Sequence, residues 1–141
     1  MPTTEKTQIT VETTVNAPVE KAWNLWISPE AIVNWNNASD DWHTPKAEDD
    51  LRVGGRFDYR MEAKDGSFGF DFGAVYDEVK PHELIAYTLE DGRKVTVSFT
   101  GHESETKIEE TFEAEGTHSI EMQQSGWQAI LNNFKKYVEN S

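Results

Sequence analysis

The amino-acid sequence predicts an α+β protein in which a curved antiparallel sheet is covered by one long C-terminal helix. Alternating apolar and polar residues indicate strands through the middle of the chain, and short turns separate them. The last part of the sequence instead has apolar residues at helical spacing. The predicted order of elements is β-α-α-β-β-β-β-β-α, and 141 residues are a usual length for a single domain, 1–141.

The N-terminal part of the sequence predicts one strand and two short helices. Residues 8–15 alternate between apolar and polar side chains, as in a half-buried strand. Pro18 suits the first position of a helix, and Pro29 repeats this signal for a second helix that ends near Val33. The first helix is expected to bury one apolar face, which consists of Val19, Ala22, Trp23 and Trp26.

Residues 34–55 show no periodic pattern and are expected to form a long loop. The segment carries Trp35, Trp42 and His43 among Asn, Asp, Ser and Pro residues. A loop of this length inside a compact domain is often functional. We therefore expect Trp35 and Trp42 to guard the entrance of a ligand site.

The rest of the sequence predicts a meander of five strands followed by the long helix. Turn signals at Asp65-Gly66, Pro81-His82 and Asp91-Gly92 separate alternating segments, and consecutive strands joined in this way are antiparallel. The predicted strands are 56–64, 68–80, 84–89, 94–100 and 106–114. The apolar face of the helix consists of Trp127, Ile130, Leu131, Phe134 and Val138.

Charge and composition argue against several classes of partner. The chain has 13 Lys and Arg against 26 Asp and Glu, a net charge of −13, whereas nucleic acids and anionic lipid surfaces require a basic footprint. It has no Cys, no leader-like N-terminal stretch and no apolar run long enough to cross a membrane. We therefore expect a cytoplasmic protein that neither binds nucleic acid nor inserts into a membrane.

Several strings of the sequence resemble the START-like helix-grip superfamily, in the branch named after the activator of the heat-shock-protein-90 ATPase. The strings are residues 9–18, 35–37, 41–45, 50–57, 61–67 and 126–131. The resemblance covers nearly the whole chain and implies a helix-grip fold with a cavity between the sheet and the long helix. The superfamily includes lipid carriers, plant hormone and pollen-allergen proteins, polyketide cyclases and co-chaperones, so fold analogy leaves the function open.

The aromatic surplus of the sequence, with five Trp, seven Phe and four Tyr, suits such a cavity. Its predicted ligand is a small hydrophobic or aromatic molecule, such as a lipid, a flavonoid or a polyketide-like compound. The alternative is that the same side chains form a solid core. The candidate ligand-binding residues are Trp35, Trp42, Phe57, Tyr59, Phe70, Phe72, Val97, Phe99, Trp127, Leu131 and Phe134.

Polar candidates are fewer. His43, beside Asp40 and Asp41, could act as a general acid or base or bind a metal, although a polar loop explains the same residues. The four His residues lack paired metal-ligand spacing, and neither a metal nor a cofactor is expected. Arg56 and Arg60 alternate with the apolar residues of their strand and are expected to face solvent. Tyrosine phenols, at positions 59, 76 and 87, could also contact a ligand.

Three functions are consistent with this sequence. The first is a non-enzymatic binding module for a small hydrophobic molecule, whose affinity comes from burial of apolar surface. The second is a cyclase- or hydrolase-type enzyme that uses the same cavity and needs a titrating group such as His43. The third and least favoured is a co-chaperone-like module with a chaperone partner, which the family resemblance suggests.

Overall fold

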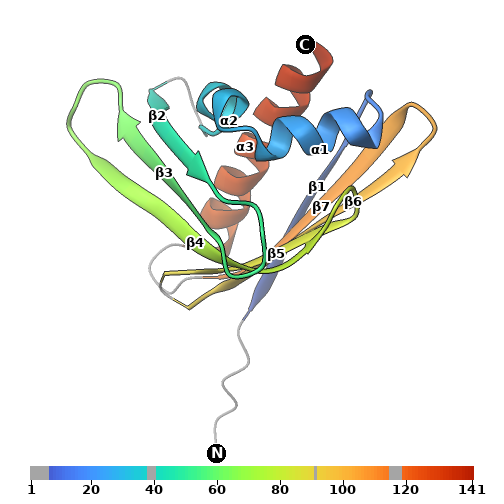
Figure 1. Cartoon of the computed structure of the whole chain (residues 1–141). Coiled ribbons are helices and arrows are strands. Elements are labelled where there is room, and N and C mark those ends of the chain that lie inside the picture. The colour runs from blue at the N-terminus through green and yellow to red at the C-terminus, as the bar shows by residue number, and fades with distance from the viewer. Residues whose placement is uncertain (1–6, 38–40, 91, 115–118) are drawn as a thin grey trace, which may run out of the picture.

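The strands form one antiparallel sheet that is bent into an open half-barrel. Figure 1 shows the three helices of the computed structural model on the inner, concave side of this sheet. The structure describes residues 7–37, 41–90, 92–114 and 119–141. The sheet has seven strands in the order β1-β7-β6-β5-β4-β3-β2, so the first and last strands of the chain are neighbours.

The order of helices and strands confirms the predicted α+β class and helix-grip topology, with one strand more than predicted. The elements are β1 (Gln8–Val15), α1 (Val19–Ile27), α2 (Pro29–Trp35), β2 (Trp42–Asp49), β3 (Arg56–Ala63), β4 (Gly69–Lys80), β5 (Leu84–Leu89), β6 (Lys94–His102), β7 (Glu105–Glu113) and α3 (Ile120–Glu139).

The additional strand, β2, corrects the prediction that residues 34–55 form a loop. It lies at the edge of the sheet and pairs with β3, with a register shift between His43 and Lys46. Pro45 lies inside this shift, and an edge strand tolerates proline because its outer N–H groups need no partner strand. The shift also interrupts the alternation of side chains, so the strand carries no clear period of two.

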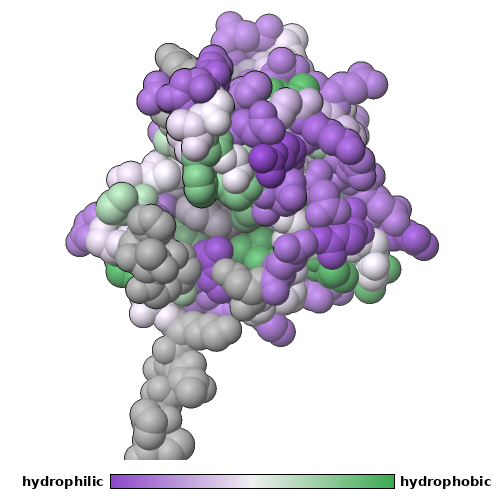
Figure 2. Space-filling model, turned by 90° about the vertical axis from the view of Figure 1, so that its left-hand side faces the viewer, coloured by the Kyte–Doolittle hydropathy of each residue, from purple (hydrophilic) through white to green (hydrophobic). Residues whose placement is uncertain are grey.

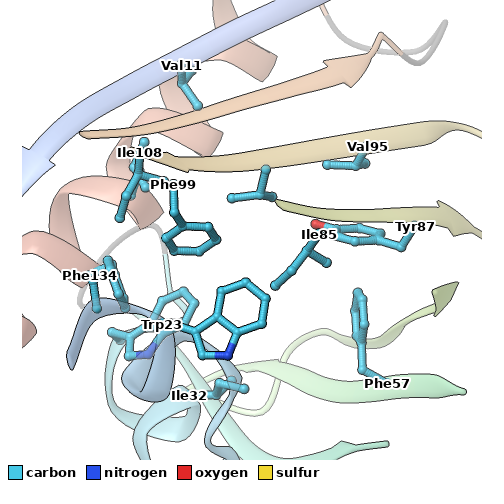
Figure 3. Close-up of a cluster of buried hydrophobic side chains, with 14 of the residues drawn as sticks. Val11, Trp23, Ile32, Phe57, Ile85, Tyr87, Val95, Phe99, Ile108 and Phe134 are labelled. Atoms are coloured by element: carbon cyan, nitrogen blue, oxygen red, sulfur yellow. The ribbon is translucent and has the colours of Figure 1, made fainter. Parts of the chain in front are cut away.

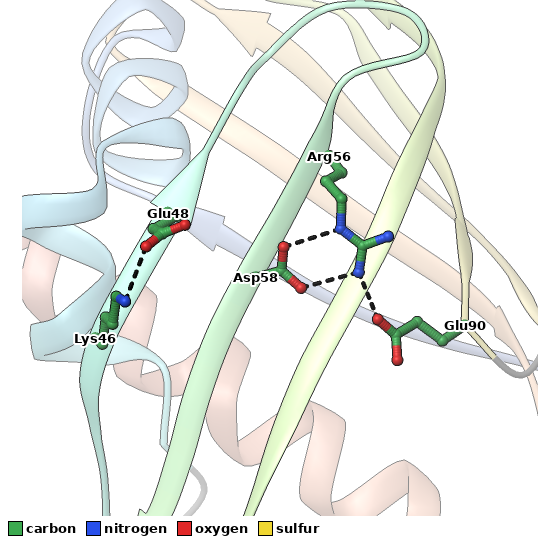
Figure 4. Close-up of polar contacts among 5 residues, drawn as sticks. All are labelled: Lys46, Glu48, Arg56, Asp58 and Glu90. Atoms are coloured by element: carbon green, nitrogen blue, oxygen red, sulfur yellow. Dashed lines mark hydrogen bonds and ion pairs between the residues drawn. The ribbon is translucent and has the colours of Figure 1, made fainter.

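The predicted alternation of β3 is confirmed. Phe57 and Tyr59 are buried, whereas Arg56 and Asp58, which alternate with them along the strand, lie on the outer face. Figure 4 shows the Arg56 guanidinium bound to both carboxylate oxygens of Asp58, at 2.9 Å each, and to Glu90. Because these side chains are largely exposed, the ion pairs contribute little stability, and Arg56 is not directed at a ligand cavity.

One end of the half-barrel is a solid aromatic core. Phe134 on α3 contacts Trp26 and Trp35 edge-on, with ring centroids 4.9 Å apart in both pairs. On the other side of this cluster, Trp26 contacts Phe99 of β6 at 5.7 Å. Trp23 contacts the same ring at 5.3 Å (Figure 3). These contacts hold all three helices against the sheet.

The Phe134→Ala substitution is expected to lower the free energy of unfolding by about 3–5 kcal/mol, because it removes a fully buried ring that no neighbour can replace. Urea denaturation checks this value. The matched control is Phe68→Ala: Phe68 is 61% exposed, so its loss should cost less than about 1 kcal/mol. Equal losses in the two variants would contradict the placement of the core.

Candidate ligand-binding cavity

A cavity of about 430 Å³ occupies the other end of the half-barrel. Its walls are the concave sides of β3, β4, β5 and β7, and the N-terminal half of α3 closes it. Trp26 and Trp35 separate it from the aromatic core described above. The volume lies within the usual range of pockets that hold small molecules.

The structure brings six of the predicted ligand-binding residues together around this cavity. They are Trp35, Phe57, Tyr59, Phe70, Phe72 and Trp127. On β4, Phe70, Phe72 and Tyr76 line the cavity. Whether any of these residues binds a ligand stays a prediction.

The other predicted residues lie elsewhere. Val97, Phe99, Leu131 and Phe134 are buried in the core and do not line the cavity. Trp42 packs against Phe68 and Phe70, with ring centroids 5.9 Å apart in both pairs, and it too is outside the cavity lining. Helical and strand periods identify residues that face inward, but they do not separate a cavity wall from a packed core.

Trp127 covers the cavity from α3. Its indole stacks on Phe112 of β7, with ring centroids 3.9 Å apart and an interplanar angle of 11°. It also meets Phe72 of β4 edge-on, at 6.3 Å. Trp127 therefore spans the space between two strands that are not neighbours in the sheet.

Apolar side chains extend from the cavity to the surface. Phe70 and Met122 line the cavity and are also exposed, so the cavity opens to solvent between β4 and α3. Figure 2 shows one face of the molecule, on which hydrophobic patches interrupt a largely hydrophilic surface. A small apolar molecule could enter at this opening without unfolding the sheet.

Glu110 places a carboxyl group in this largely apolar cavity. It lines the cavity from β7, where it pairs across the sheet with Val97 and Val11, and it is only 6% exposed. Among the described residues no hydrogen bond or ion pair to its carboxyl is found. Burial alone raises the pKa of Glu110 from 4.5 to about 8, so the group is mainly protonated at neutral pH.

Sequence reasoning missed Glu110, although the signal was present. In the predicted strand 106–114, the apolar residues Ile108 and Phe112 share one face, and a period of two places Glu110 between them on that same face. An acidic residue in an apolar row of strand positions is rare enough to indicate a functional group.

A second buried carboxyl lies behind the cavity wall. The Tyr76 hydroxyl donates to Oδ1 of Asp49 at 2.7 Å, whereas Oδ2 of Asp49 is buried without a partner. Burial raises the pKa of Asp49 to about 6, against the opposing effect of hydrogen bonds from Tyr76 and Tyr59. Of the tyrosines considered as ligand contacts, Tyr76 thus has its hydroxyl engaged within the protein.

His43 does not line the cavity. Its side chain is 43% exposed, and its Nε2 lies 3.8 Å from Oε1 of Glu62 on the neighbouring strand. The geometry therefore supports no catalytic role for His43 in this cavity. Asp40, its predicted neighbour, lies outside the described residues. Within the described ranges, no three His, Cys, Asp or Glu side chains are grouped closely enough to hold a metal ion.

A bent antiparallel sheet that holds a long C-terminal helix, with a cavity between them, defines a helix-grip protein. A family model described as activator of Hsp90 ATPase homolog 1-like protein matches residues 16–139. The chain belongs to this family. No curated protein matches it significantly.

Solved structures of similar proteins share the fold over nearly their whole length. An AHSA1-like protein from Aeromonas hydrophila is 44% identical, with a TM-score of 0.89 over 95% of this chain and 93% of that one. A protein from Cytophaga hutchinsonii is 55% identical, with a TM-score of 0.82 over 94% and 92% of the two chains. A Chromobacterium violaceum protein at 23% identity and a TM-score of 0.84 over 94% and 96% supports the fold alone.

The expectation that this protein does not insert into a membrane concerns the length and hydropathy of its helices. In the part of the chain that the structure describes, none of the helices is both long enough and apolar enough to cross a membrane.

Glu110 should make stability depend on pH. Native Glu110 keeps a proton that the unfolded chain releases near pH 4.5, so the unfolded state binds fewer protons and stability falls as pH rises. The free energy of unfolding is expected to fall by about 2 kcal/mol between about pH 6.5 and 9 because of this group. Urea denaturation of the ligand-free protein across this range measures the decline.

The Glu110→Gln variant should lose this decline and be more stable than the native protein at the upper end of the range. Glu109→Gln is the matched control, because Glu109 is adjacent in sequence and its side chain is 44% exposed beside Lys107. The control should retain the native pH dependence. A decline of the same size in Glu110→Gln would contradict the assignment to Glu110.

Proposed function

We propose that this protein binds a small, mainly apolar molecule, aromatic or lipid-like, in the cavity between the sheet and α3, and that it does so without chemical reaction. The observation that carries the proposal is the cavity itself, about 430 Å³ with aromatic walls. Burial of apolar ligand surface would drive binding at roughly 25 cal/mol per Å², less the cost of ordering the ligand.

The walls support the proposal because their rings hold one another in place. Phe57 stacks on Tyr59, with ring centroids 4.5 Å apart. It also meets Tyr87 edge-on at 4.9 Å, and Figure 3 shows these two residues on the sheet. Rings fixed by such contacts lose little freedom when a ligand arrives, and this preorganisation favours affinity. Flat aromatic compounds, such as flavonoid- or polyketide-like molecules, suit these surfaces as well as a lipid chain does.

The proposed binding protein acts in the cytoplasm as a single domain, 1–141. The pairing of β1 with β7 supports the domain assignment, because it joins the first and the last strand in one sheet. The absence of Cys is consistent with a reducing compartment.

Neither rival function has comparable support. The enzyme hypothesis relied on His43, which is exposed and outside the cavity lining. The chaperone hypothesis rests on the family name, and Hsp90 is the partner of the protein for which the family is named.

The Gly126→Phe substitution tests the cavity directly. Gly126 lines the cavity on α3, and a Cβ added there meets nothing within 4 Å, so a ring can enter the space without displacing packed atoms. Affinity for the fluorescent apolar probe phenyl-naphthylamine is expected to fall at least about tenfold, since the ring occupies ligand volume. Titration of probe fluorescence measures the change.

Gly126→Ala is the matched control. It keeps most of the cavity open, should bind the probe like the native protein, and should gain up to about 1 kcal/mol of stability because alanine favours the helix. Unchanged binding in a folded Gly126→Phe protein would place the probe elsewhere and contradict the proposed function.

A further inference from the structure

We propose that Glu110 is the polar contact of the bound molecule, and that this molecule carries a hydrogen-bond donor, a hydroxyl or an ammonium group, on its apolar body. The inference deepens the proposed binding function and rests on it. It starts from a buried carboxyl that faces the cavity and has no hydrogen-bond or ion-pair partner among the described residues.

An unpaired buried carboxyl is costly to the protein alone. Buried polar groups in folded proteins are nearly always hydrogen-bonded, and an apolar residue at this position would complete the row formed by Val11 and Val97. A ligand donor that reaches Glu110 would supply the missing partner. Polar groups of this kind, few in number and placed in an apolar cavity, set the orientation and specificity of a ligand.

Several other polar groups of the cavity have partners within the protein. Tyr76 donates to Asp49, the Trp35 indole donates to the Leu25 carbonyl, and both Arg93 and Gln123 have interactions of their own. Glu110 contributes a carboxyl group to this lining, and no hydrogen bond or ion pair with a described residue occupies that carboxyl.

The surroundings of Glu110 favour a donor rather than an anion. Tyr87 interacts electrostatically with Glu110. Burial, together with the negative charge of an ionised Glu110, holds the pKa of the Tyr87 phenol well above its ordinary value. Arg93 also lines the cavity, and it has an interaction of its own. Burial raises the pKa of Glu110. The tyrosines on β3 and β4, Tyr59 and Tyr76, are directed to Asp49.

Both donor groups fit these walls. A protonated carboxyl pairs with a hydroxyl, while an ionised one pairs with an ammonium group. Aromatic faces such as those of Trp35 and Trp127 attract a cation, and the net charge of −13 draws cations towards the protein.

The test compares naphthol and methylnaphthalene, substituted at the same ring position, which differ in the donor but hardly in shape. Isothermal titration at neutral pH is expected to give the native protein an about tenfold preference for naphthol. The variant Glu110→Met keeps the volume and removes the carboxyl, so it should bind both probes equally and methylnaphthalene at least as well as the native protein does.

Glu109→Met is the control, because its side chain lies on the opposite face of β7, and it should keep the native preference. A preference for naphthol that persists in Glu110→Met, or no preference in the native protein while methylnaphthalene still binds, would overturn this inference and leave the proposed function standing. If the native protein bound neither probe, the proposed function would fail and the inference with it.

A third probe, aminomethylnaphthalene, distinguishes the two donors. An ammonium group needs the ionised carboxyl, so its binding near neutral pH must release the Glu110 proton, and its affinity should rise with pH up to about pH 8. Tighter binding of this probe than of naphthol, with that pH dependence, would identify an ammonium donor. The reverse order would identify a hydroxyl, and either result, if lost in Glu110→Met, supports the role of Glu110.

Discussion

The structure depends on one mismatch of size, between a wide bent sheet and the single long helix that must cover it. Seven strands spaced about 4.8 Å apart extend roughly 29 Å along the curve of the sheet, whereas a helix with its side chains is about 10 Å wide. The helix α3 packs along β1, and α1 and α2 fill one end of the half-barrel with α3. The concave side of β3, β4 and β5 is left with no helix directly upon it. The cavity is the space that remains.

Aromatic side chains keep this cavity from collapsing. An uncovered apolar sheet face would otherwise collapse, but rings such as Phe57, Tyr59 and Phe72 are stiff and support one another in stacked or tilted contacts. Trp127 reaches across from Phe112 to Phe72 and fixes the distance between α3 and the far wall. The same rings therefore stabilise the fold and form the surface that a ligand would contact.

Two carboxyl groups distinguish this cavity from a simple gap in the core. Asp49 is partly compensated by the Tyr76 hydroxyl, and Glu110 is not compensated by any described residue. Both lower the stability of the empty protein above neutral pH, as expected where a binding site is maintained at a cost to stability. Family membership and relatives at 44% and 55% identity establish the shared fold, while the cavity supports the proposed function.

The fold class, the alternation of most strands and the apolar face of α3 follow from the sequence. These features depend on local periods of two residues in strands and 3.6 residues in helices. The alternation in β3 shows the first period, and the spacing of Leu131 and Phe134 in α3 shows the second. The sequence did not reveal β2, because Pro45 and the register shift at the sheet edge break the period. The three-dimensional packing is needed to see that Phe72 faces a cavity while Phe99 faces a packed core. It is also needed to see that Glu110 lies in the cavity with no partner among the described residues. Both distinctions depend on where α3 crosses the sheet, and that crossing is set by long-range packing rather than by any local pattern.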